Sequence, residues 1–146
     1  MPANTSPIFI LTPDRGINGG ARLSGANTTR DLSSTSNASI LFSGGTNGSR
    51  VDAIDWVHSS TGATASVATI GRLFQCSDTS YSNPRLIKEI SLPVITPNQT
   101  ATVGQTQPMT FTTPLFLPSG YSLVVTLGTA QSAGNYYDVT CYGGDY

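Results

Sequence analysis

From Asn37 onward the chain is a succession of short apolar runs, separated roughly every 8 to 15 residues by glycine, proline, asparagine and serine. Such spacing is typical of strands joined by turns, and no run has the length of a bundle helix. With 15 Gly and 9 Pro but 38% hydrophobic residues, the composition is too apolar for a disordered chain. The pattern predicts an all-β fold of about eight short strands.

The strand candidates alternate apolar and polar residues, as half-buried strands do. In residues 121–127 one face carries Tyr121, Leu123, Val125 and Leu127, and in residues 136–142 Tyr137, Val139 and Cys141 face one way. In residues 50–58 the alternation changes phase after Ala53, which a β-bulge would explain. Asn47-Gly48 is a strong hairpin signal. Gly71 marks a bend or a close approach. Residues 85–92 also suit two helical turns, but β-branched content and Pro93 favour a strand. The candidates are residues 39–43, 50–58, 63–75, 85–92, 100–103, 109–113, 115–117, 121–127 and 136–142.

This number of strands, with long connections between them, favours a β-sandwich of the jelly-roll type over an immunoglobulin-like sandwich. A chain of 146 residues buries about two thirds of its surface in such a fold, so one domain is stable without metals or disulfides. We assign the sandwich domain to residues 37–146.

Residues 1–36 differ from the rest because residues 8–11 are their one apolar run, followed by Gly, Asn, Thr and Ser. So few apolar anchors cannot offset an ordering entropy of ~1 to 2 kcal/mol per residue. We therefore expect an extended N-terminal arm that docks on a partner or a neighbouring copy. The alternative is that residues 8–11 form the first strand of the domain. The predicted interface residues are Ile8, Phe9, Ile10, Leu11, Arg15, Arg22 and Arg30.

Charge and hydropathy argue against nucleic acid and membrane as partners. Seven basic and eight acidic residues give a net charge of -1, and the basic residues form no cluster. No segment approaches the ~18 apolar residues of a membrane span, and the first residues lack the pattern of a secretory signal. We expect synthesis in the cytosol, and there Cys76 and Cys141 are expected as two buried thiols, with a disulfide as the alternative.

Residues with catalytic potential are few. His58 is the one histidine, with Asp52 and Asp55 nearby in sequence. Strand alternation turns Asp55 away from the other two, so we expect a surface histidine at a strand end; a hydrolase using these residues is the alternative. No spacing of His, Cys or carboxylates suits a metal. We expect no cofactor, no metal and no enzymatic activity.

Aromatic residues offer a different kind of site. Trp56 and the six tyrosines would stack on sugar rings if they were exposed on one face. Trp56 lies in a central strand candidate, where a tryptophan usually belongs to the core. A glycan-binding module that uses Trp56 and Tyr137 is therefore kept as an alternative.

Five phrases occur in an order and spacing that resemble those of a known family. They are residues 47–54 (NGSRVDAI), 71–74 (GRLF), 85–90 (RLIKEI), 117–123 (LPSGYSL) and 142–146 (YGGDY). Over residues 40–146 the chain resembles the head decoration, or capsid cement, proteins of tailed bacteriophages. The resemblance implies a β-sandwich or jelly-roll on the outer capsid surface, a homotrimer, and the major capsid protein as partner.

The expected function is therefore structural: a virion protein, made in the host cytoplasm, that binds and stabilises the outer surface of the capsid. A cement protein acts through many modest contacts, and an ordered arm on a small rigid domain suits that role. The alternative is a tail- or fibre-associated module that binds a host glycan.

Overall fold

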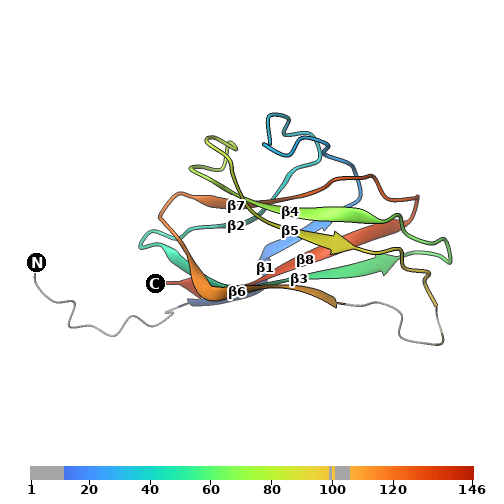
Figure 1. Cartoon of the computed structure of the whole chain (residues 1–146). Coiled ribbons are helices and arrows are strands. Elements are labelled where there is room, and N and C mark those ends of the chain that lie inside the picture. Colours follow the sequence, from blue (N-terminus) through green and yellow to red (C-terminus); the bar gives the residue numbers. More distant parts are fainter. Residues whose placement is uncertain (1–11, 99, 101–105) are drawn as a thin grey trace, which may run out of the picture.

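The computed structural model describes residues 12–98, 100 and 106–146, and in this part of the chain every regular element is a strand. Two four-stranded sheets lie face to face (Figure 1). Sheet A has the order β1-β8-β3-β6 and sheet B the order β2-β7-β4-β5. The strands are β1 (Thr12–Leu23), β2 (Ser39–Ser43), β3 (Ser49–Ser60), β4 (Thr69–Cys76), β5 (Arg85–Leu92), β6 (Thr106–Leu117), β7 (Ser122–Leu127) and β8 (Asn135–Asp145).

The pairing of the strands has the jelly-roll arrangement. The first strand pairs with the last, the second with the seventh, the third with the sixth and the fourth with the fifth, all antiparallel. Two further pairings, β3 with β8 and β4 with β7, complete the sheets. The chain is thus a long double ribbon wrapped into two sheets. The predicted all-β jelly-roll sandwich is confirmed.

Strand β3 contains the predicted bulge. Its register shifts between Val51 and Ala53 against both neighbours, β6 and β8. Val51 is buried before the shift, and Ile54 and Trp56 are buried after it. The bulge therefore keeps apolar side chains on the core side where strict alternation would turn them outward.

The main core lies between the sheets and is centred on Trp56 of β3, which is fully buried. Opposite it, Gly71 of β4 lies so close that a Cβ there would be 2.9 Å from the indole Cη2. This confirms the predicted close approach at Gly71. On β8, Tyr137 and Val139 alternate into the core as the sequence indicated.

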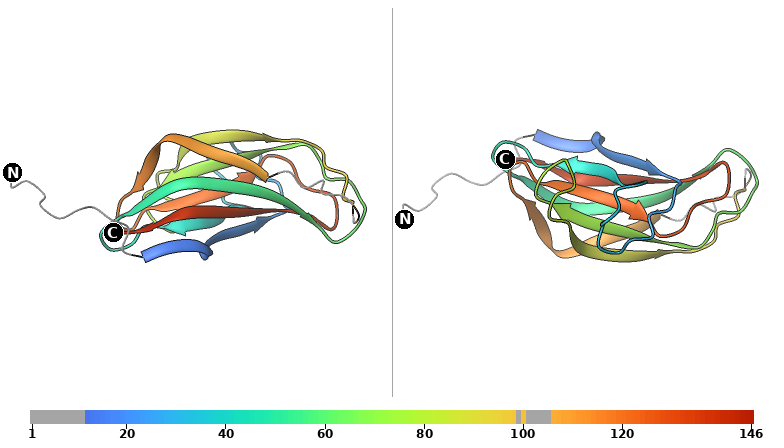
Figure 2. Two further views of the ribbon diagram at one scale, coloured as in Figure 1. Left: turned by 90° about the horizontal axis from the view of Figure 1, so that it is seen from below. Right: turned by 90° about the horizontal axis from the view of Figure 1, so that it is seen from above.

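A second, smaller core covers the outer face of sheet B. Residues 24–38 cross that face, and Leu32 packs there against Phe74, Cys76 and Val124. The right panel of Figure 2 shows this segment lying over sheet B. Because both faces of sheet B are covered, all six residues of β7 are buried. The sequence predicted only one buried face for this strand.

The two cysteines lie in different cores. Cys76 belongs to the second core and Cys141 to the main core, so sheet B separates them. Both are buried and no disulfide joins them. This agrees with the expectation of two buried thiols. Burial raises the pKa of the Cys76 thiol, and the nearby carboxylate of Asp78 adds to the effect.

The predicted boundary between arm and domain at residue 36 is wrong for residues 12–36. Residues 12–23 are strand β1, which pairs with β8 at the edge of sheet A, and residues 24–36 help to cover sheet B. Leu23 and Leu32 are each 3% exposed. The register between β1 and β8 shifts between Arg15 and Gly20, in the glycine-rich part of β1. Because of this irregular part, β1 lacks the continuous apolar–polar alternation that marks a strand in the sequence.

Two other sequence predictions need correction. The turn at Asn47-Gly48 is present, with Gly48 at φ +86°, but it joins β2 of sheet B to β3 of sheet A and is no hairpin. Residues 109–113 and 115–117 belong to a single strand, β6. Of the predicted strand at 100–103, residues 101–103 lie outside the described residues.

Candidate binding face

His58 is buried and does not meet an acidic partner. It is 8% exposed, its Nε2 lies 2.8 Å from Oδ1 of Asn135, and its ring meets Tyr137 edge-on. The Asn135 amide nitrogen donates to the Thr64 carbonyl, which turns its oxygen towards His58, so His58 donates from Nε2. The expectation of a surface histidine is wrong because the β3 bulge turns His58 inward.

The two aspartates near His58 in sequence lie elsewhere. Asp55 points to the outer face of sheet A, since Ile54 and Trp56 on either side of it point inward. Asp52 is exposed and accepts a hydrogen bond from Arg50 at 2.7 Å. The structure therefore does not bring the three proposed hydrolase residues together. Within the described ranges, no group of three His, Cys, Asp or Glu side chains is placed to hold a metal ion.

The proposed sugar-stacking pair is also ruled out by burial. Trp56 and Tyr137 both have no exposed surface and lie in the main core. Neither ring can meet a ligand on the surface without unfolding of the sandwich.

Among the predicted interface residues, Arg22 has a partner in its own chain. Its guanidinium binds Asp138 of β8 in a bidentate pair, at 2.6 and 3.1 Å, and lies over the Tyr136 ring. The hydrogen bond from Arg22 lowers the pKa of Asp138, and the same bond raises the pKa of Arg22. The prediction that Arg22 pairs with another subunit is corrected: β1 lies beside β8 in sheet A.

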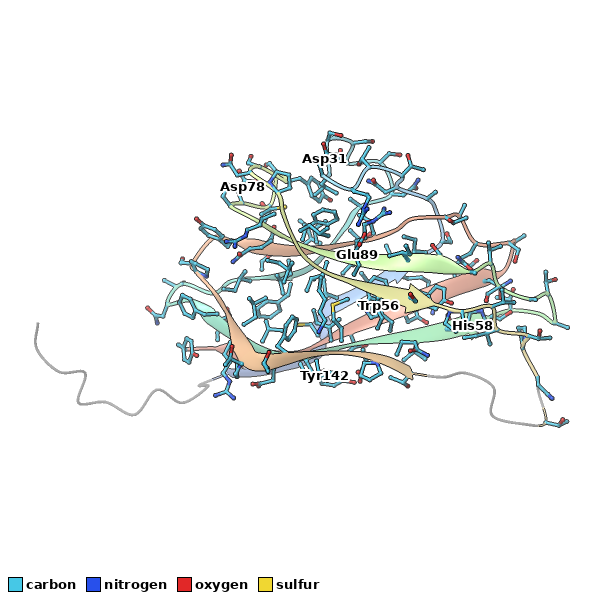
Figure 3. The ribbon with its side chains drawn as sticks, viewed as in Figure 1. Asp31, Trp56, His58, Asp78, Glu89 and Tyr142 are labelled. Carbon is cyan, nitrogen blue, oxygen red and sulfur yellow. The ribbon has the colours of Figure 1, made fainter. Side chains whose placement is uncertain are left out.

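Arg30 also pairs within the chain. Its Nη2 donates to Oε2 of Glu89 at 2.6 Å, while the other oxygen of Glu89 accepts from Arg72 at 3.0 Å. Arg72 is 6% exposed and also donates to the Asn27 carbonyl. The hydrogen bond from Arg72, followed by that from Arg30, lowers the pKa of Glu89. Figure 3 shows Glu89 beneath the segment that carries Asp31.

Asn27 forms hydrogen bonds within residues 24–38 and also joins this segment to sheet B. Its side-chain nitrogen donates to the carbonyls of Ser34 and Ser36, and its side-chain oxygen accepts from Thr29. Its backbone nitrogen donates to the Leu127 carbonyl at 2.7 Å. With the Arg30-Glu89-Arg72 pairs, these bonds close the outer face of sheet B.

Two further predicted interface positions complete the set. Arg15 lies in β1, where its register partner is Tyr142 of β8. The apolar run at residues 8–11 lies outside the described residues.

The outer face of sheet A is open, in contrast to that of sheet B. In the left panel of Figure 2 no described segment crosses it. Strand pairing places its residues in rows across β8, β3 and β6, and Tyr142, 37% exposed, projects from this face (Figure 3). We call this surface the open face. It consists of Ala53, Asp55, Val57, Thr106, Pro108, Thr110, Asp138, Thr140 and Tyr142.

Most charges on this side of sheet A are paired with one another. Asp138 binds Arg22, the pair Arg50–Asp52 lies on the same side, and Asp55 is a further carboxylate. Threonine hydroxyls, short apolar side chains and Tyr142 make up the rest. A surface of this kind is inexpensive to desolvate compared with a charged one.

Each outer strand of the two sheets has a feature that discourages pairing with another chain. β1 is irregular, β2 has five residues, β5 carries Lys88, and β6 carries Pro108 and Pro114. The single lysine and these two prolines thus lie on outer strands, where they oppose pairing with a strand of another chain.

Comparisons with known proteins add no identification. No protein-family model and no curated protein matches the chain. The structure is similar to that of the Eiger TNF from S. frugiperda, with a TM-score of 0.39 and 11% sequence identity over 89% of this chain and 88% of that chain. A similarity this low carries no argument about function. In the part of the chain that the structure describes, no helix is long and apolar enough to cross a bilayer.

Proposed function

We propose that this protein is a structural virion protein that binds the outer surface of a bacteriophage capsid and stabilises it. The observation that carries the proposal is the contrast between the two outer faces of the sandwich. Within the described ranges, residues 24–38 cover sheet B, whereas no segment covers the open face of sheet A. The resemblance of residues 40–146 to capsid decoration proteins supplies the kind of partner, the major capsid protein.

The chemistry of the open face suits contact with a large protein surface. Its side chains are short, and strand pairing holds them on one regular sheet, so little side-chain entropy is lost on binding. Tyr142 is the large aromatic side chain of this face, of a residue type enriched in protein interfaces. One such contact is modest, but many copies on one shell add their effects.

The proposal includes self-association as a homotrimer on the virion, which the resemblance implies. The described outer strands are protected within the single chain, so strand pairing between subunits is not required for solubility. Contacts between copies would then use side chains and the N-terminal residues.

The test is binding of the purified chain to capsids assembled without it. Thr140→Glu and Thr110→Glu each place a charge on the open face, and we expect capsid affinity to fall at least tenfold with an unchanged melting temperature. Val94→Glu is the matched control, because Val94 is 57% exposed and lies outside the open face. Equal affinity of all three variants and the native protein would exclude this face as the capsid contact.

A further inference from the structure

The two sheets differ in how closely their edge strands approach each other. At one edge of the sandwich β1 and β2 lie close together, whereas at the other edge β5 and β6 barely touch (Figure 1). At the β5–β6 edge a groove of about 280 Å³ is lined by Lys88 of β5 and residues 110–116 of β6. Ligand sites usually measure ~300–1,000 Å³, so this groove suits a few side chains of a peptide segment.

An irregularity in β6 makes the groove. Thr110 pairs with Ala53 and Leu115 pairs with Val51, so the four residues between Thr110 and Leu115 face a single residue of β3, Asp52. Their backbone groups therefore lack regular ladder partners on β3. This segment carries a Pro and two exposed Thr residues, and it bends away from sheet A.

Half of the residues that line the groove are apolar and half are polar, with one cation among the polar ones. Phe111 and Leu115 are half-buried, and Phe116 is 55% exposed. Lys88 reaches across from β5, where its Nζ donates to the Thr110 carbonyl and lies 5.6 Å from the centre of the Phe111 ring. An apolar segment in extended conformation would bury these rings.

Residues 8–11 of this chain have the required chemistry. The run is Ile-Phe-Ile-Leu, and the prolines at 7 and 13 favour an extended backbone on either side. It lies outside the described residues and connects directly to Thr12, the first residue of β1.

The chain's own groove is out of reach of this run. Thr12 pairs with Asp145, Asp145 with Ser49, and Ser49 with Leu117, so β6 lies three strand spacings away. At about 4.8 Å per spacing, that distance is about 14 Å. Four residues span at most about 14 Å when fully extended, so the whole run would be used in crossing sheet A.

We propose that residues 8–11 of one copy dock in the β5–β6 groove of a second copy, against Phe111, Leu115 and Phe116. This inference rests on the self-association in the proposed function and does not depend on capsid binding. Each copy gives its N-terminal run to one neighbour and receives that of another. A head-to-tail contact closes into a ring when the rotation between neighbours returns to the first copy, and the proposed trimer is such a ring of three.

Disulfide trapping tests the contact directly. Ile10→Cys and Phe116→Cys are made as two single variants of the full chain, mixed, and oxidised. The native cysteines are buried, at 0% and 2% exposed, and stay out of the reaction. We expect a two-chain product on a non-reducing gel at least tenfold stronger in the mixture than in either variant alone. Val94→Cys, at a site 57% exposed, replaces Phe116→Cys in the control mixture and should give no such product.

A variant that carries both Ile10→Cys and Phe116→Cys in one chain then distinguishes contact between copies from contact within one chain. We expect covalent products of two and three chains. Cross-linking that leaves only single chains, or a mixture no more reactive than its controls, would overturn the proposal. Capsid binding of the same preparations is measured separately: native binding without trapping overturns the exchange alone, and trapping without capsid binding overturns the capsid function alone.

A surface variant gives independent evidence. Phe116→Asp should reduce the mass of the native assembly in light scattering to that of one chain, and Val94→Asp should leave the mass unchanged. An assembly that survives Phe116→Asp, or a native chain of monomer mass at tens of micromolar, would contradict the exchange.

Discussion

The indole of Trp56 in sheet A lies directly against Gly71 of sheet B in the main core. A Cβ on residue 71 would lie 2.9 Å from Cη2 and 3.0 Å from Cζ3 of the indole. Both of these atoms belong to a fully buried ring, which has no free space to move into. The absence of a side chain at 71 is therefore what allows the tryptophan to fill the core.

Gly71→Ala should destabilise the protein by about 1–3 kcal/mol, because one added methyl overpacks a dense core. Gly62→Ala is the control, since a Cβ at Gly62 would have nothing within 4 Å. We expect the control to change the free energy of unfolding by no more than ~0.5 kcal/mol. Chemical denaturation measures both. Equal effects of the two substitutions would contradict the close contact.

Glu89→Ala should cost about 1–3 kcal/mol, since it removes a charged hydrogen-bond partner from the buried Arg72. Arg30→Ala breaks the other half of the same cluster, but the Arg30 side chain is 68% exposed. A pair exposed to this extent contributes ~0–1 kcal/mol. Thermal unfolding of both variants at pH 7 checks the order. A larger loss for Arg30→Ala would show that the covering segment depends on its exposed ion pair.

Acid should weaken the attachment of residues 24–38 to sheet B. The hydrogen bonds from Arg72 and Arg30 lower the pKa of Glu89 below its usual 4.5. The native state therefore binds this proton less readily than the unfolded state does, and the stability it contributes is complete above pH 4.5. That contribution is lost as the pH falls from 4.5 through the lowered pKa of the folded protein.

Comparison with Glu89→Gln isolates this contribution. The fall in melting temperature between pH 7 and pH 3 should be smaller for Glu89→Gln than for the native protein. Other carboxylates with lowered pKa values, such as Asp78 and Asp138, remain in both proteins and titrate equally. Superimposable pH profiles would mean that Glu89 contributes nothing to acid sensitivity.

Two N-terminal deletions should have opposite consequences for folding. Removal of residues 1–11 leaves every described contact in place, so the melting temperature should stay near the native value while self-association is lost. Removal of residues 1–36 also takes away β1 and the buried Leu23 and Leu32. Each buried leucine is worth about 2–5 kcal/mol, against a total stability of ~5–15 kcal/mol, so this protein should unfold or aggregate. Circular dichroism and light scattering measure both. A folded 1–36 deletion would show that β1 is dispensable.

Features that depend on residues close together in the chain were predictable from the sequence. Alternation at Tyr137 and Val139 predicted the buried face of β8, and the change of phase near Ala53 predicted the bulge. Gly71 was recognised as a close approach because a glycine inside a strand removes the side chain that would otherwise fill the space.

Features that depend on residues far apart in the chain became visible in the folded structure. Arg22 meets Asp138 across 116 positions and Arg30 meets Glu89 across 59, so no local pattern announces either pair. β1 was missed because its glycines weaken the alternation that marks a strand, and pairing with β8 supplies the stability that its own sequence lacks. The inward position of His58 depends on the bulge six residues earlier, and its Asn135 partner lies 77 positions away. Periodicity reports which face of a strand is apolar, but the choice of neighbouring strand is made by long-range packing, and that choice fixes which side chains meet.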